Sequence, residues 1–202
     1  MKLKTLISKS EVRNIVLKRR KEIDDKELAV HTKKIIEKVS ALDEFVYAKT
    51  IHIYISTRSG EVDTRGLINF MEGQGKSIVV PKFNIKSRKF SHGNFIDWDH
   101  LEKNKEGYFE PIVGTDDDLS DIDLMIVPAV AVSTLGQRVG YGGGYYDKLL
   151  KLTRAPKFVL AFEFQVFDSI ETDIHDVRID KVITERRVIS TREIMPRETE
   201  VI

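Results

Sequence analysis

Apolar residues recur at helical spacing in the first part of the chain. The run EVRNIVLKRRKEI (11–23) follows Ser10, which we expect to be its N-cap, and predicts an amphipathic helix. Its expected apolar face consists of Val12, Ile15 and Val16, with the basic residues, Arg20 among them, on the other faces. A second helix is predicted over ELAVHTKKIIEKVSAL (27–42).

Farther along, short apolar runs rich in β-branched and aromatic residues predict strands. These are TIHIYIS (50–56), SIVVP (77–81), DLMIVPAVAV (123–132) and FVLAFEF (158–164). Helical patterns at 64–73 and 145–152 separate them, and an irregular polar section follows 81. The nearly continuous apolar run at 123–132 is typical of a strand covered on both faces. This alternation predicts one α/β domain over residues 1–190, with a mainly parallel sheet flanked by helices and a polar tail at 191–202.

Composition narrows the classes of function. The chain has 202 residues, a formal net charge of +1 and no cysteine. The missing cysteine excludes disulfides, thiolate catalysis and sulfur-ligated metals. The near-neutral charge gives no global field for nucleic acid, and no apolar run reaches the about 18 residues of a membrane span. We therefore expect a cytoplasmic protein that binds neither nucleic acid nor membrane. A monomer is a separate expectation that composition does not provide.

Four glycines lie within five residues in the stretch VGYGGGYYDKLL (139–150). Glycine clusters mark backbone that adopts positive φ or approaches a ligand closely. The cluster follows a predicted strand and precedes a predicted helix, where backbone amides bind phosphate. Its spacing fits neither a P-loop nor a dinucleotide fingerprint, so a purely structural turn is the alternative.

Two charged residues flank the glycines. Arg138 offers a bidentate fork for phosphate, although it could equally be a surface arginine. Asp147 could hold magnesium beside phosphates, or could simply be stabilised by the start of its helix. On the residues alone, both interpretations stay open.

The run PAVAVSTLGQRVGYGGGYYDKLL, from Pro128, resembles the signature of the 5-formyltetrahydrofolate cyclo-ligase family, also called 5,10-methenyltetrahydrofolate synthetase. The pattern G-x-R-[VL]-G-x-G-x-G-Y-Y-D matches Gly136 to Asp147. Further pieces follow in the family's order, namely Lys9 and Arg13, YISTRSGEVDT, Pro81, GYFEP and HDVRIDKVITE. The resemblance covers the chain from about Lys9 to Ile189.

The resemblance implies an ATP- and Mg²⁺-dependent ring closure of 5-formyltetrahydrofolate on a fold similar to the phosphosugar isomerase and CoA-transferase group. It assigns ATP contacts to Lys9, Arg13, Arg138, Gly140, Gly142, Gly143, Gly144, Tyr145 and Tyr146. It assigns folate contacts to Ile55, Glu61 and Tyr145, and magnesium to Asp147 and Asp176, with Asp180 as a substitute. Arg138 and Tyr145 are the expected catalytic residues.

The chain departs from the family pattern at several places. Val132 and Ser133 replace a Phe-Asp pair, Gly143 stands where some members carry lysine, and the turn before Glu61 is one residue longer than in some relatives. The alternative is therefore a nucleotide-binding member that is non-catalytic or acts on another substrate. A more remote alternative is RNA binding through the basic run at 18–21, but such runs usually form solvated helix faces.

Overall fold

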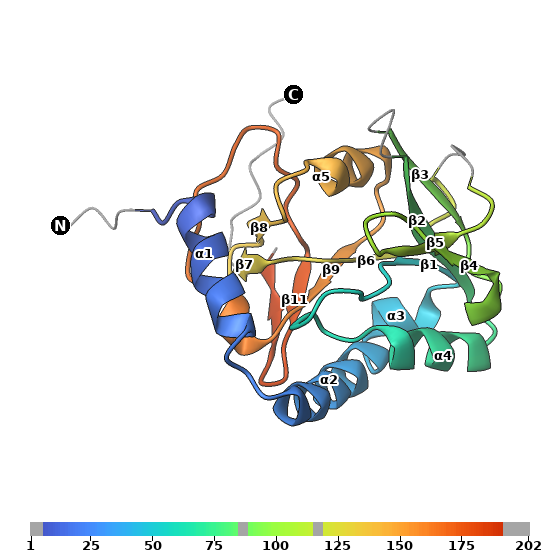
Figure 1. The fold of residues 1–202 in the computed structure, drawn as a ribbon, viewed down its shortest axis with the longest axis horizontal. Helices are drawn as coiled ribbons and strands as arrows, with labels where there is room; N and C mark the ends of the chain where they lie inside the picture. Colours follow the sequence, from blue (N-terminus) through green and yellow to red (C-terminus); the bar gives the residue numbers. More distant parts are fainter. Residues whose placement is uncertain (1–5, 85–88, 115–118, 192–202) are drawn as a thin grey trace.

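The computed structural model describes residues 6–84, 89–114 and 119–191 (Figure 1). Within them, one central sheet has seven strands in the order β12-β11-β9-β6-β1-β2-β3. These strands are β1 (Thr50–Ile53), β2 (Ser77–Asn84), β3 (Lys89–Asn94), β6 (Leu124–Val127), β9 (Lys157–Leu160), β11 (Lys181–Ile183) and β12 (Val188–Ser190). The inner strands pair in parallel, and β3 and β12 join the edges antiparallel. The predicted α/β domain with a mainly parallel sheet is confirmed.

Helices cover both sides of this sheet (Figure 1). On one side lie α2 (Asp25–Ser40), α3 (Asp43–Tyr47) and α4 (Arg65–Gly73), and on the other lies α5 (Tyr145–Leu149). All residues of β6 and β9 are buried, which explains their continuous apolar sequence. No helix in the described part of the chain is long and apolar enough to cross a membrane.

Helix α1 (Lys9–Arg20) begins earlier than predicted. Ser8 is its N-cap: the Ser8 hydroxyl accepts from the amide of Glu11, and the Glu11 carboxylate accepts from the amide of Ser8. This reciprocal capping box satisfies two amides that the helix leaves unpaired. The prediction of Ser10 as the cap is wrong, because Ser10 already lies inside the helix.

The buried stripe of α1 also differs from the prediction. It consists of Val12, Val16 and Arg20, which are spaced by four residues and so share one face. Ile15 was expected on this face, but its exposed fraction is 50%. Arg20 was expected on the surface, but its exposed fraction is only 5%. The basic run at 18–21 is thus not a uniform charged face.

The apolar run at 123–132 forms two strands, not one. It breaks after β6 at Pro128, which has no backbone N–H to donate. The chain then forms β7 (Ala131–Ser133) and β8 (Arg138–Val139), which pair antiparallel in a second small sheet, with β10 (Val166–Phe167) parallel to β7. The glycine cluster therefore follows a strand of this small sheet instead of the main sheet.

Ser133 closes the turn between β7 and β8. Its hydroxyl donates to Oε1 of Gln137 at 2.7 Å and accepts from the amides of Leu135 and Gln137, both at 3.2 Å. Val132 and Ser133 are both fully buried. The pair that departs from the family pattern therefore has a structural role in this chain.

Other predicted elements are shorter than expected. After α5 the chain continues as a 3₁₀ turn (Leu150–Leu152), and after β9 another 3₁₀ turn (Glu163–Gln165) replaces the end of the predicted strand.

The section expected to be irregular contains β3 and the hairpin of β4 (Leu101–Lys103) with β5 (Phe109–Pro111). Thr191, where the predicted tail starts, is buried and its hydroxyl donates to the carbonyls of Ile179 and Asp180. The remainder of that tail, 192–202, lies outside the described residues.

Candidate active site

A pocket of about 520 Å³ lies beyond the carboxyl ends of β1 and β6. These neighbouring parallel strands continue in opposite directions across the sheet, β1 to β2 and β6 to β9. Such a switch in strand order opens a crevice where α/β proteins bind ligands. Residues after both strands, Ile55 and Pro128, line the pocket.

This one pocket brings together every residue that the sequence proposed for the site. They are Lys9, Arg13, Ile55, Glu61, Arg138, Gly140, Gly142, Gly143, Gly144, Tyr145, Tyr146, Asp147 and Asp176. The substitute, Asp180, is not among the lining residues. Its carboxylate instead accepts from the amide of Lys157 at 2.8 Å.

The glycine loop, which we define as residues 140–144, forms one wall. Gly142 and Gly144 have φ of +104° and +67°, values that side chains disfavour. The ring of Tyr145 packs against Gly143, where an added Cβ would lie 2.5 Å from a ring carbon. The carbonyl of Gly140 accepts from Nε of Arg13 at 2.7 Å, so α1 holds the start of the loop.

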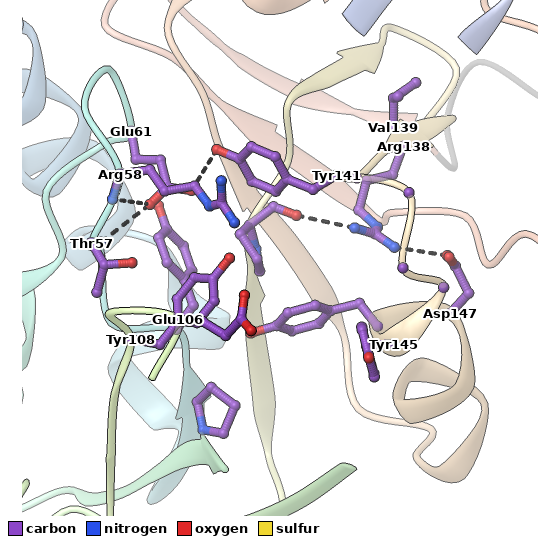
Figure 2. A pocket seen from close by; sticks show the side chains of 18 of the residues that line it. Thr57, Arg58, Glu61, Glu106, Tyr108, Arg138, Val139, Tyr141, Tyr145 and Asp147 are labelled. Atoms are coloured by element: carbon purple, nitrogen blue, oxygen red, sulfur yellow. Dashed lines mark hydrogen bonds and ion pairs between the residues drawn. The ribbon is translucent and has the colours of Figure 1, made fainter. Parts of the chain in front are cut away.

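Arg138 lies beneath the loop and is largely buried, with 4% of its side chain exposed. Its Nη2 donates to Oδ1 of Asp147 at 2.7 Å, and its Nη1 donates to the carbonyl of Pro128 at 3.1 Å (Figure 2). Its guanidinium also lies over the ring of Tyr146, which is buried in the core. The guanidinium thus fixes the position of the Asp147 carboxylate and places a positive charge at the glycine loop.

Lys9 joins α1 to the segment after β10. Its ammonium donates to Asp173 at 2.6 Å and also to Asp176. Burial lowers the pKa of Lys9, but the bonds to both carboxylates outweigh burial and raise it. The hydrogen bond from Lys9 lowers the pKa of Asp173. A cation and two anions therefore meet at this end of the pocket.

The carboxylates of the pocket suit a particular kind of metal binding. Within the described part of the chain there is no group of three or more His, Asp or Glu side chains that could hold a metal ion. Asp147 and Asp176 each already accept from a cationic side chain. Magnesium beside phosphates is usually held by one or two carboxylates, water and the phosphates themselves. The donor set therefore fits an ion that arrives with a phosphate ligand, and it does not fit a permanent all-protein metal cage.

Glu61 lies at the other end of the pocket. Its Oε2 accepts from the amides of Thr57 at 3.3 Å and Arg58 at 3.2 Å, and its Oε1 accepts from the hydroxyl of Tyr141 at 2.8 Å (Figure 2). The backbone of the turn after β1 therefore orients the carboxylate. Ile55 is buried nearby as part of the apolar core.

Sequence reasoning missed Tyr141, which stands between two glycines at a position that the motif leaves open. Its ring lies under the guanidinium of Arg58, 4.2 Å from the guanidinium carbon to the ring centroid. Arg58 also lies over the ring of Tyr108, at 5.1 Å. Figure 2 shows Tyr141 reaching from the glycine loop toward Glu61. The signal that the sequence offered for Tyr141 was an aromatic side chain placed between two glycines of this loop.

A pocket at the switch point of a parallel sheet, with cations and a glycine loop at one end and an oriented carboxylate at the other, defines an enzyme of the α/β class. The model of the 5-formyltetrahydrofolate cyclo-ligase family matches residues 6–185. The chain belongs to the 5-formyltetrahydrofolate cyclo-ligase family.

Relatives and solved structures agree with this assignment. The chain is 29% identical to the probable 5-formyltetrahydrofolate cyclo-ligase of Caenorhabditis elegans, over 90% of this chain and 94% of the relative. It is 30% identical to the enzyme of Escherichia coli K12, over 71% and 81%. The NMR structure of Aquifex aeolicus 5,10-methenyltetrahydrofolate synthetase superposes with a TM-score of 0.81 at 31% identity, covering 96% of this chain and 97% of that one.

Proposed function

We propose that this chain converts 5-formyltetrahydrofolate to 5,10-methenyltetrahydrofolate, with ATP as co-substrate and Mg²⁺ as cofactor. The observation that carries the proposal is the convergence of the proposed nucleotide residues and the proposed folate residues on one pocket. The names of the relatives support the reaction type. The cytoplasmic location and the monomeric state stay predictions.

The nucleotide is assigned to the end with the glycine loop. Lys9 and Arg13 lie one helical turn apart on α1, and both line the pocket. We propose that they bind the phosphates of ATP together with the backbone of the glycine loop and Tyr145 and Tyr146. Arg138 contributes positive charge from below, where a water-poor environment strengthens electrostatic interactions.

The pterin of the folate is assigned to the end with Glu61. Its aminopyrimidinone edge carries adjacent N–H donors, and an ionised carboxylate is an acceptor-only group that can receive two of them. The backbone bonds of Thr57 and Arg58 keep the Glu61 carboxylate in place for this contact. Ile55 supplies apolar contact beside it, and Tyr145 is placed between the two substrates.

The proposed reaction has two steps. The γ-phosphoryl group moves from ATP to the formyl oxygen, releasing ADP. N10 of the folate then attacks the activated carbon and releases its proton to solvent, the carbon–oxygen bond breaks with its electron pair leaving on the phosphate, and the methenyl bridge forms. Phosphoryl transfer depends mainly on positioning and on neutralising charge. In this chain Lys9, Arg13 and Arg138 neutralise charge, and Glu61 positions the acceptor.

Asp147 and Asp176 would hold a magnesium ion together with the phosphates. The ion would supply additional positive charge at the transferred group. Arg138 holds Asp147, and Lys9 holds Asp176, before ligands bind.

The test is to mix the purified protein with 5-formyltetrahydrofolate, ATP and Mg²⁺ and to follow absorbance by the methenyl product. Product should appear only when all three are present. Product formed equally without ATP would contradict the proposal. Tight nucleotide binding without turnover would favour a non-catalytic member or another substrate. The buried Val132-Ser133 pair, which motivated that alternative, does not line the pocket.

A further inference from the structure

A chain of hydrogen bonds links α1, the glycine loop and Glu61, and its bond between Tyr141 and Glu61 joins two residues that line the pocket. Nη1 of Arg20 donates to the hydroxyl of Tyr141 at 2.5 Å, and this hydroxyl donates to Oε1 of Glu61 at 2.8 Å. Nη2 of Arg20 donates to the carbonyl of Ala129 at 2.9 Å, which anchors the guanidinium beside the end of β6. We call these three side chains, Arg20, Tyr141 and Glu61, the hydrogen-bonded chain.

The donor and the acceptor of each hydrogen bond in this chain are determined by the chemistry of Arg20. A guanidinium has only donors, so Arg20 uses a lone pair of the Tyr141 oxygen and leaves the Tyr141 proton for Glu61. Burial and the charge of Glu61 raise the pKa of Tyr141 to about 12, so the phenol keeps this proton. Glu61 is thereby held as an acceptor, the form that the proposed folate contact requires.

Helix α1 carries the residues that hold the start of the glycine loop and those that hold Tyr141. Lys9, Arg13 and Arg20 are spaced by four and seven residues, which places all three on the same face of α1. Arg13 holds the glycine loop at the carbonyl of Gly140, and Arg20 holds the next residue, Tyr141, through its hydroxyl. Tyr141 is exposed to 37%, and the three following glycines are also exposed. The loop therefore depends on few contacts for its position.

We propose that Tyr141 is a positioning residue that couples the nucleotide end of the pocket to the folate end. This inference rests on the proposed function of the two ends. A nucleotide that binds to the glycine loop restricts the loop further and with it Tyr141, which strengthens the bond that its hydroxyl already makes to Glu61. When folate binds afterwards, the protein loses less conformational entropy than it would without the nucleotide. Each ligand therefore strengthens the binding of the other. Linkage requires the effect to be equal in both directions.

The test is isothermal titration calorimetry on the full chain. The dissociation constant of 5-formyltetrahydrofolate is measured alone and with saturating AMPPNP and Mg²⁺, and the reverse titration is also made. Wild type should show folate affinity at least about fivefold higher with the nucleotide analogue, the lower end of usual coupling. Failure of either ligand to bind wild type would overturn both the proposed function and this inference. Binding of both ligands without coupling would overturn the inference alone.

The decisive variant is Tyr141→Phe, which deletes both bonds of the hydroxyl but keeps the ring under Arg58. The ratio of folate affinities measured with and without the nucleotide analogue should fall to about one, which is the loss of coupling that the proposal requires. Tyr108→Phe deletes the same atom from the other tyrosine that contacts Arg58, and it should retain the coupling. Wild-type coupling in Tyr141→Phe, or its loss in both variants, would overturn the assignment to Tyr141.

A second variant, Arg20→Met, tests the anchor of the hydrogen-bonded chain. Methionine keeps an apolar stem in the place of the arginine stem. The carbonyl of Ala129 keeps a second donor, Nε2 of Gln165 at 3.2 Å, so the variant should fold. A circular dichroism melt checks this. Coupling should fall as in Tyr141→Phe, and a folded Arg20→Met protein with full coupling would overturn the role of the chain.

Discussion

Gly60 lies against the stem of Arg20 so closely that a Cβ on Gly60 would be 2.7 Å from both Cβ and Cγ of Arg20. Gly60 also has φ of +74°. The turn that carries Glu61 can therefore sit on α1 only because residue 60 has no side chain. This contact explains why a basic residue of α1 is buried under the turn.

The first prediction compares Gly60→Ala with Gly75→Ala. Gly75 has a similar φ of +68°, but a Cβ added there would meet no atom of the described residues within 4 Å beyond its chain neighbours. Gly75→Ala should cost about 1–2 kcal/mol of unfolding free energy from backbone strain alone. Gly60→Ala should cost about 1–3 kcal/mol more, because it also overpacks the site. Urea unfolding measures the unfolding free energies of both variants. Equal losses would show that the Arg20 side chain moves away from the added methyl group at no measurable cost.

The second prediction concerns Glu61→Gln. The side-chain amide accepts at its oxygen only, so its NH₂ group faces either the hydroxyl of Tyr141 or the backbone amides of Thr57 and Arg58, and it mismatches a pterin donor on that side. KM for 5-formyltetrahydrofolate should rise by about 10- to 150-fold, the scale of a hydrogen bond to a charged group, with little change in the affinity for ATP measured without folate. Glu106→Gln, another acid that lines the pocket, is the matched control. Weaker binding of ATP alone, with KM for folate unchanged, would remove Glu61 from the folate end.

The third prediction concerns Arg138→Met, which removes the charge beneath the glycine loop. ATP binding should weaken by about 10- to 150-fold on the same scale. Asp147, whose side chain is 30% exposed, can then be hydrated, so the protein should remain folded. Calorimetry and a thermal melt without ligand are read together, with Arg19→Met on the exposed face of α1 as the control. Wild-type ATP affinity in Arg138→Met would show that this arginine only shapes the loop.

The fourth prediction is a pH dependence of stability that arises from His52 in β1. This side chain is fully buried, and neither ring nitrogen has a hydrogen-bond partner among the described residues. Burial, with the nearby His92, lowers its pKa from 6.5 to about 3. Below pH 6.5 His52 binds a proton in the unfolded chain but stays unprotonated in the folded chain. The contribution of uncharged His52 to the unfolding free energy is therefore complete above pH 6.5. It is lost as the pH falls toward 3, by up to about 1.4 kcal/mol per pH unit.

Urea unfolding of wild type and His52→Leu at several pH values checks this prediction. The difference in unfolding free energy between the two proteins should be constant above pH 7. It should shift in favour of His52→Leu as the pH falls from 6.5. A difference that stays constant down to pH 4.5 would contradict the buried, uncharged state of His52.

The sequence predicted the alternation of strands and helices because β6 and β9 are buried on both faces and so are apolar throughout. It did not predict the break at Pro128, since the apolar residues resume directly after it. It also placed Arg20 on the surface, because periodicity assigns a charged residue to solvent. Only the tertiary contacts with Gly60, Ala129 and Tyr141 show why this arginine is buried.

The candidate site was largely predictable where a local motif carried it. The glycine loop, Arg138 and Asp147 lie within one short stretch, and the structure places all of them at one pocket. The bond between Tyr141 and Glu61 joins residues 80 positions apart, and the ion pair between Lys9 and Asp173 joins residues 164 positions apart. No spacing rule predicts such pairs, because the fold alone brings them together.

The packing of α1 has a consequence for synthesis on the ribosome. Its buried stripe contacts β7 and β8, which are translated more than 100 residues later. At typical elongation rates this delay lasts on the order of 10 s. During this time Val12 and Val16 have no native partner from β7 or β8, so the nascent chain exposes an apolar helix face that chaperones can bind. Substitutions on this face should therefore affect the yield of folded protein during expression more than they affect refolding of the completed chain.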